Sequence, residues 1–465
     1  MRFRGSDRGP SGSLCVLVFV IARLLTFRSL SYPWSWDDLH LVRTFTPSEL
    51  VQGLTGTWDV DHIETPGYRP GTVLFNEARA IAFREDVVAH RVFVLGLFAV
   101  LLTLLARLAV QLGTPLWIAA LGCLFALVSR DNWWNLTWPS DGPRVFACML
   151  GLAAVSLFFS GLLHPARWKL PACIATAALA VLTREEPLAL FPVMLVLGPL
   201  AVLVNQGFIG PWVIRSWPRV ALSLLAVGVI LVVARVIAVL GAPPVRGTDP
   251  ISLLGWPRDA AIVLYPMGLG NLLSAISDPV HITWTAFLVL LTVAAVRLVS
   301  RPAQLRTMLW LFCAVVTCAP GVFGPRPNIL ILPIAFFGLA LAEILGALLV
   351  HSNRLANVLG AVAILFVVVT AASQSMRAQE ELHPLSLARM QVNEMMVYGR
   401  YAGLTTIPLG RQQAVEAELA IYGIYSDADF QRVWSSLRQD ALGAGRNGPN
   451  PEGLPFAPPV GFLAS

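Results

Sequence analysis

Charged residues are scarce in this chain. Only 13% of its 465 residues are Asp, Glu, Lys or Arg, whereas a typical soluble protein carries about 25%. The chain is instead 56% hydrophobic, with a mean hydropathy of +0.69. Because one membrane-spanning helix takes about 20 apolar residues, the composition predicts one polytopic membrane body rather than several soluble domains.

Several other features are missing, and each absence excludes a class of function. Lys169 is the only lysine among 33 basic residues, and the net charge of +6 is spread over short loops. This distribution argues against a nucleic-acid partner, which would need one basic patch. The chain has no Walker A, Gly-rich dinucleotide, His-Glu-x-x-His or Cys-x-x-Cys motif, which argues against nucleotide chemistry and structural zinc. No cofactor is therefore required, and a divalent metal is allowed but not indicated.

The six cysteines also lack the pattern of a disulfide or metal set. All of them lie in apolar stretches, and none lies in a long polar loop. We expect them to be small buried side chains.

Apolar segments of helical length recur along the chain. They predict an all-α integral membrane protein with about eleven spanning helices. The segments cover residues 13–31, 88–111, 114–129, 143–163, 170–183, 187–204, 218–240, 282–299, 307–320, 328–350 and 354–373. Arg23 and Arg28 interrupt the first segment, so a cleaved signal peptide is an alternative there, although no small-x-small cleavage site follows.

The charges predict how the helices are oriented. With the N-terminus in the cytoplasm, the short inner loops hold arginine and Lys169 but no acid, which is the positive-inside pattern. Of 27 Asp and Glu residues, only Asp7 and Glu343 then fall inside or within the membrane. The expected location is the cell (inner) membrane, with an extracytoplasmic C-terminus.

This topology divides the chain into a membrane body, residues 1–375, and a C-terminal extracytoplasmic region, residues 376–465, which we expect to be partly disordered. Two long loops, 32–87 and 241–281, lie outside in this topology. In the first loop, Thr46-Pro47-Ser48-Glu49 predicts a capped helix that runs to about Leu54. A second helix is expected from Pro70 through Ile81, and an interfacial helix over 257–276.

Asp37-Asp38 is the first candidate site, because it lies just after the first apolar segment. One of these carboxylates could act as a general base toward an acceptor hydroxyl. A solvated loop start or a helix cap is the simpler interpretation.

Two basic motifs on the same predicted face are candidates for substrate binding. Tyr68-Arg69-Pro70 lies towards the end of the first loop, and the planar guanidinium of Arg69 would suit a phosphate. Arg184-Glu185-Glu186 follows a short apolar segment, so its charges could lie in a cavity at membrane depth. The simpler alternatives are a loop arginine paired with Asp61 or Glu64, and an ordinary interfacial turn.

Three further residues are weaker candidates. Asp141 follows a Trp-rich stretch of the second outer loop and could orient an acceptor or bind a metal. His281 and Arg326 could each meet a lipid phosphate. Glu343 lies within the tenth apolar segment. We expect it to be a buried polar group, whose partner the sequence does not identify.

In order and spacing, these motifs resemble those of the polyprenol-phosphate-sugar-dependent glycosyltransferases of the GT-C fold, especially the protein O-mannosyltransferase branch and its bacterial relatives. Members with tetratricopeptide repeats carry Tyr-Asp-Asp, Tyr-Arg-Pro-Leu and Lys-Glu segments. The corresponding segments here are Trp36-Asp37-Asp38, Tyr68-Arg69-Pro70-Gly71 and Arg184-Glu185. The resemblance covers roughly residues 10–375, and the repeat domain is missing.

The resemblance implies a function. A hexose, such as mannose, would move with inversion from a polyprenyl-phosphate donor to a hydroxyl of a protein or glycan acceptor. Asp37, with Asp38 beside it, would activate that hydroxyl, and Arg69, Arg184 and Arg326 would hold the leaving phosphate. The alternatives are a polytopic lipid or glycan transporter or flippase, and a polymerase or ligase of lipid-linked glycans. A transporter should show paired repeats and polar groups at the midplane.

Overall fold

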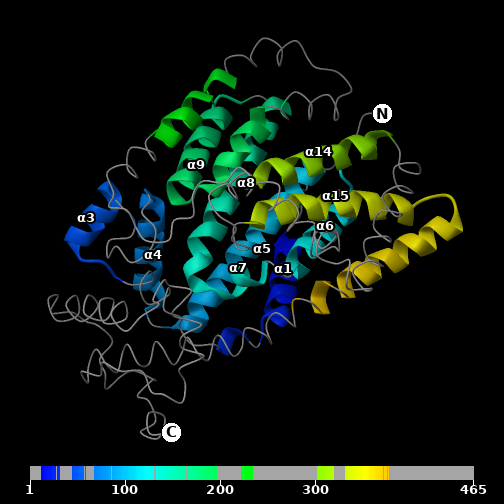
Figure 1. The fold of residues 1–465 in the computed structure, drawn as a ribbon, viewed down its shortest axis with the longest axis horizontal. Helices are drawn as coiled ribbons and strands as arrows, with labels where there is room; N and C mark the ends of the chain where they lie inside the picture. The colour runs from blue at the N-terminus through cyan, green and yellow to red at the C-terminus, as the bar shows by residue number, and fades with distance from the viewer. Residues whose placement is uncertain are drawn as a thin grey trace, which may run out of the picture.

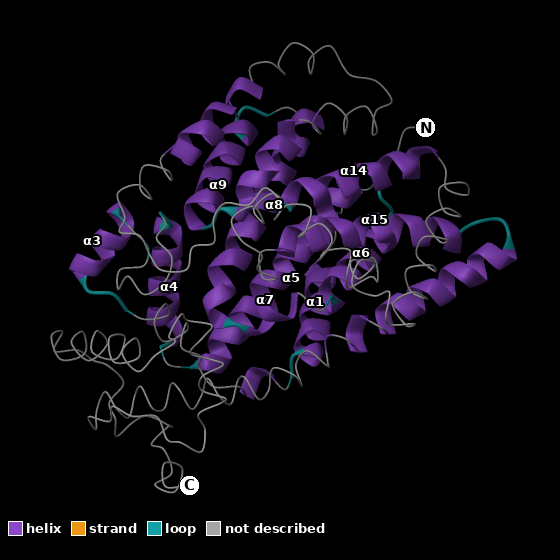
Figure 2. Ribbon diagram, in the orientation of Figure 1, coloured by secondary structure: helices purple, strands orange, loops and turns teal. Residues whose placement is uncertain are grey.

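The computed structural model describes the greater part of the helical body. The described residues are 12–27, 29–31, 44–56, 58, 68–84, 86–129, 132–163, 166–195, 198, 221–223, 225–233, 301–318, 330–369, 371–373 and 375. Every regular element in these ranges is helical, and they contain no strand (Figure 2). The all-α prediction is confirmed for this part of the chain.

Four of the described helices are long and apolar enough to cross a membrane: α5 (Val87–Gln111), the run Pro139–Leu162 that includes α8 (Gly142–Leu163), α15 (Ile331–Leu349) and the helix Arg354–Ser373. Shorter apolar helices lie within or overlap other predicted segments. They are α1 (Gly12–Leu25), α6 (Leu116–Val128), α9 (Lys169–Thr183), Glu186–Leu195, Ala221–Val233 and α14 (Arg301–Thr317). The predicted span 282–299 and the interfacial helix 257–276 lie outside the described residues.

The two helices predicted in the first loop are confirmed. Helix α3 (Pro47–Thr55) begins as its sequence requires: the Thr46 hydroxyl accepts from the Glu49 N–H, and the Glu49 carboxylate accepts from the Thr46 N–H at 2.7 Å. This reciprocal pair satisfies N–H groups that the first helical turn leaves unpaired. Helix α4 (Pro70–Phe83) starts at the proline of the Tyr68-Arg69-Pro70 motif, where the missing N–H costs nothing.

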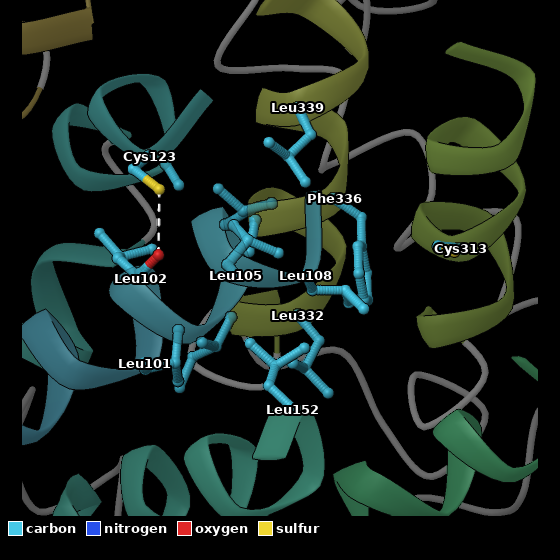
Figure 3. Close-up of a cluster of buried hydrophobic side chains, with 14 of the residues drawn as sticks. Leu101, Leu102, Leu105, Leu108, Cys123, Leu152, Cys313, Leu332, Phe336 and Leu339 are labelled. Atoms are coloured by element: carbon cyan, nitrogen blue, oxygen red, sulfur yellow. Dashed lines mark hydrogen bonds between the residues drawn. The ribbon is translucent and has the colours of Figure 1, made fainter. Parts of the chain in front are cut away.

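Helix α5 runs through the middle of the bundle. It packs against α1, α6 and α8, while α8 packs on α9 and α15 packs on both α6 and α14 (Figure 1). Figure 3 shows leucines of α5, among them Leu101, Leu105 and Leu108, between side chains of the neighbouring helices. The close approach of α15 to α6 depends on glycine, because a Cβ at Gly338 would lie 2.7 Å from the Gly122 carbonyl oxygen.

Polar interactions collect at two ends of the bundle. We call the end with the N-termini of α5 and α8 and the C-termini of α1 and α9 the first end. There the Arg91 guanidinium donates to the carbonyls of Thr137 at 3.0 Å and Leu30 at 3.1 Å, which ties three segments together. The opposite, second end holds Lys169, which donates to the Ser160 carbonyl at 3.0 Å.

Candidate functional site

Arg69 and Glu185 form the contact around which the site is built. The Arg69 Nε donates to one Glu185 carboxylate oxygen at 2.9 Å, and its Nη2 pairs with the other. This two-point geometry matches the planar fork of arginine to a carboxylate. The two residues are 116 positions apart in the sequence. The folded chain therefore brings the Tyr68-Arg69-Pro70 motif and the Arg184-Glu185-Glu186 turn together at the first end of the bundle.

The backbone holds this pair in place through a close contact between the start of α4 and the end of α9. The Thr72 hydroxyl, in the first turn of α4, donates to the Thr183 carbonyl at the end of α9 at 2.5 Å. Gly71 lies so close that an added Cβ would be 2.9 Å from Thr183 Cα and 3.0 Å from Thr183 N. Arg69 is the residue before α4, so this contact fixes where its side chain starts.

Arg144, on the first turn of α8, is the centre of a second set of ion pairs. Its Nε donates to Glu186 Oε1 at 2.7 Å, and its Nη1 pairs with Asp141. All three residues are buried, with 3% to 7% of their surface exposed. Buried charges are costly unless they are paired and hydrogen-bonded. The pairing explains how this set is tolerated.

Arg184 is less well neutralised than the other two arginines. Its Nη2 is 4.0 Å from Asp141, its side chain is 8% exposed, and its Nε has no hydrogen-bond partner in the described part of the chain. Burial, followed by repulsion from Arg69 and Arg144, lowers the pKa of Arg184 from its ordinary value to about 9. A bound anion beside this guanidinium would supply the charge and the acceptor that it lacks.

Trp58 connects the first loop to these charges. The indole ring is buried and lies 4.9 Å from the guanidinium carbon of Arg69 and 5.7 Å from that of Arg184. A ring face attracts a cation more strongly where water is excluded. Trp58 packs with Val73 of α4, and with Phe45 and Leu50 at its edge, in a small core separate from that of the bundle. The first loop thus covers the two arginines with an aromatic side chain.

The arginine–carboxylate cluster consists of Arg69, Asp141, Arg144, Arg184, Glu185 and Glu186. Four predicted site residues, Arg69, Asp141, Arg184 and Glu185, lie in it as neighbours. Tyr68, which is half-buried, directly precedes Arg69. Asp141 was predicted as an acid available to an acceptor or a metal, but it is buried and paired with Arg144.

The other predicted site residues lie outside the described part of the chain. They are Asp37, Asp38, His281 and Arg326. Sequence reasoning also missed two residues of the site, Arg144 and Trp58. An arginine three positions after Asp141, in the first turn of an apolar segment, was a signal for Arg144, because an unpaired charge at that place would be costly. No comparable local signal marks Trp58.

Another buried ion pair lies at the opposite end of the bundle. Glu343 of α15 is fully buried and accepts from Arg306 Nε of α14 at 2.7 Å and from the Thr114 hydroxyl at 2.5 Å. These contacts identify the partners that the sequence left open. They join α14 and α15 to the turn before α6, and we interpret them as structural.

The described residues contain no group of three His, Cys, Asp or Glu side chains arranged to hold a metal ion. In comparisons with known proteins, no family model matches the chain, and no curated protein sequence matches it significantly.

Proposed function

We propose that this protein is a membrane glycosyltransferase of the GT-C type that transfers a single hexose from a polyprenyl-phosphate donor to an acceptor hydroxyl. The observation that carries the proposal is the arginine–carboxylate cluster. It joins Arg69 and Glu185, from two motifs that resemble those of the family, in a two-point ion pair. Beside that pair, the Nε of the buried Arg184 has no hydrogen-bond partner among the residues that the structure describes.

The chemistry of the reaction needs these features. The acceptor oxygen attacks the anomeric carbon, the bond from that carbon to the phosphate oxygen breaks, and polyprenyl phosphate leaves with its electron pair. The acceptor proton passes to Asp37 or Asp38 in this proposal. Because phosphate is already a good leaving group, the protein has only to position the base and stabilise the charge that develops on the phosphate.

Within the cluster, Arg184 has the clearest role in binding phosphate. Arg144 has both of its carboxylate partners, and Arg69 has Glu185 at two points. In the described part of the chain, the ion pair of Arg184 with Asp141 is long, at 4.0 Å, and the pKa of Arg184 is lowered. A donor phosphate at Arg184 would restore its pKa toward the ordinary value, and Arg69 would add to the positive potential.

In the proposed topology, the first end of the bundle is the extracytoplasmic face of the cell (inner) membrane. The N-terminus is then cytoplasmic and the C-terminus extracytoplasmic. Two facts support it: the acids of the cluster lie at the first end, and the lysine of the acid-free loops, Lys169, lies at the second. The partners are the lipid-linked sugar, membrane lipids and a protein or glycan acceptor.

The test is transfer of radiolabelled hexose from polyprenyl-phosphate hexose to acceptors by the purified protein in liposomes. We expect Asp37→Asn or Asp38→Asn, whichever is the base, to abolish transfer in folded protein. Arg184→Gln should reduce it by about 10²–10³, the usual effect of removing one charge-stabilising donor. Arg107→Gln is the matched control, because Arg107 is an exposed arginine of α5 away from the cluster; it should retain full activity.

Each rival function has its own outcome in the same liposomes. Movement of the intact lipid-linked sugar between leaflets, without transfer, would replace the proposal with a flippase. Transfer from a polyprenyl-diphosphate glycan, but not from the monophosphate, would replace it with a polymerase or ligase. Full activity of both aspartate variants would rule out the proposed base.

A further inference from the structure

Helix α4 buries polar side chains and exposes apolar ones. Its buried face carries Thr72, Asn76 and Arg79, which are 1% to 2% exposed. Its outer face carries Leu74 at 50% exposure and Ile81 at 61%, with the exposed Ala78 between them. These three positions share one side of a helix. A helix on the surface of a water-soluble protein has the opposite arrangement, with its apolar stripe toward the core.

Each of these three polar side chains makes a hydrogen bond within the protein. Thr72 donates to the Thr183 carbonyl at 2.5 Å. Arg79 donates to the Pro139 carbonyl at 2.5 Å and to the Asn76 side-chain oxygen at 3.1 Å. Since this polar face is fixed by interactions with the bundle, the apolar face must point away from it.

Aromatic contacts set the depth of α4 along the bundle. Phe75 stacks on Phe146 of α8 with ring centroids 4.9 Å apart, and Phe83 lies 5.3 Å from Phe93 of α5. Phe146 is four residues after Gly142, and Phe93 is six residues after Val87. At 1.5 Å per residue, these rings lie about 6 and 9 Å inside the helix ends. Interfacial helices bury their apolar faces by about 5–10 Å.

The length and the ends of α4 exclude a crossing of the membrane. Its 14 residues span about 21 Å, less than the roughly 30 Å of the hydrocarbon layer. It starts at the C-terminal end of α9 and finishes just before Asp86, the N-cap of α5. Both belong to the first end of the bundle, and Figure 1 shows α4 at the flank, beside the longer helices.

We propose that α4 is an interfacial helix whose Leu74–Ala78–Ile81 face is in contact with the acyl chains of bilayer lipids. The helices that α4 contacts also expose apolar side chains, since Leu179 of α9 and Val88 of α5 are each 44% exposed. The segment is therefore part of the membrane-embedded body rather than of a loop in water. Arg69, which precedes α4, consequently lies at the level of the lipid headgroups.

Spin-label accessibility in liposomes tests this proposal without any substrate. Nitroxides would be attached to Leu74→Cys, Ala78→Cys and Ile81→Cys in a Cys15→Ser background, because the other five cysteines are buried. Collisions with oxygen, which partitions into hydrocarbon, would be compared with collisions with a water-soluble nickel chelate. Leu179→Cys on α9 is the lipid reference, and Ser48→Cys at the start of α3 is the water reference.

The proposal expects the labels at positions 74, 78 and 81 to give the high oxygen-to-nickel ratio of position 179. A ratio like that of position 48 would place α4 in water and overturn the proposal. Protection from both reagents would also overturn it, because the face would then be covered by protein. Because three positions are labelled, the test still decides the question if one variant fails to fold. None of the outcomes depends on the proposed glycosyltransferase activity.

Discussion

The junction between Gly71 and Thr183 gives the sharpest prediction. A Cβ at position 71 would overlap the Thr183 hydroxyl oxygen and approach Thr183 Cα to 2.9 Å. The Cα belongs to the backbone of α9, so no side-chain rotation relieves the overlap. Forcing extra volume into such a contact costs about 1–3 kcal/mol. We therefore expect Gly71→Ala to destabilise the protein and to loosen the Arg69–Glu185 pair.

Gly96→Ala is the matched control. Gly96 is also helical, in α5, but nothing lies within 4 Å of where its Cβ would be. Alanine should therefore stabilise that position by up to about 1 kcal/mol through helix propensity. Equilibrium unfolding of both variants in mixed micelles measures the difference between them. We expect Gly71→Ala to be less stable than Gly96→Ala by about 1–3 kcal/mol, the packing term alone.

A double variant separates the two parts of the overlap. Thr183→Ala removes the hydroxyl oxygen but keeps the backbone contact, so Gly71→Ala should cost less in the Thr183→Ala background than in the wild type. If Gly71→Ala is as stable as Gly96→Ala, α4 does not approach α9 this closely, and the geometry derived for Arg69 is wrong.

Three further predictions concern the buried charges. Arg144→Met should cost about 3–5 kcal/mol of unfolding free energy, because it leaves two buried carboxylates without their partner. Arg306→Met should cost a similar amount at the other end of the bundle, since Glu343 is fully buried. Burial lowers the pKa of Arg184 in the folded state to about 9, below its ordinary value, so the unfolded state binds more protons above pH 9. The stability of the wild type relative to Arg184→Met should therefore rise from pH 8 to pH 10.

Each of these predictions has an outcome that would contradict it. Unchanged stability of Arg144→Met or Arg306→Met, measured by the same unfolding titration, would mean that the remaining carboxylates reach water. A stability difference between wild type and Arg184→Met that stays constant from pH 8 to pH 10 would mean that Arg184 is solvated when folded. Arg107→Met, at an exposed position of α5, is the control for removing an arginine.

Gly71 also shows why a motif read alone can mislead. The family that the motifs resemble has leucine at this position, and the sequence alone suggests that the difference is mild. The structure shows instead that even one added methyl group would collide with α9. The size of the residue at position 71 is set by a neighbour more than 100 positions away, and that information is absent from the local sequence.

The sequence by itself determined the helical class and the local features that depend on near neighbours. Apolar runs predicted α5, α8 and α15, and the Thr46–Glu49 capping box and Pro70 predicted where α3 and α4 begin. These features follow from backbone hydrogen bonding and hydrophobicity within a few residues. The sequence also identified Arg69, Arg184 and Glu185 as candidates, because charges beside apolar segments are costly unless they are used or paired.

Only the tertiary structure decided how those charges are paired and which way α4 faces. It paired Arg69 with Glu185 and placed Arg144 between Asp141 and Glu186. Of the three arginines in this cluster, Arg184 is the one whose Nε has no hydrogen-bond partner among the described residues. It also turned the polar side of α4 inward. Periodicity shows that a helix has two faces, but which face is buried depends on what the neighbouring helices offer: here carbonyl groups for Arg79 and Thr72, and lipid for Leu74 in our proposal.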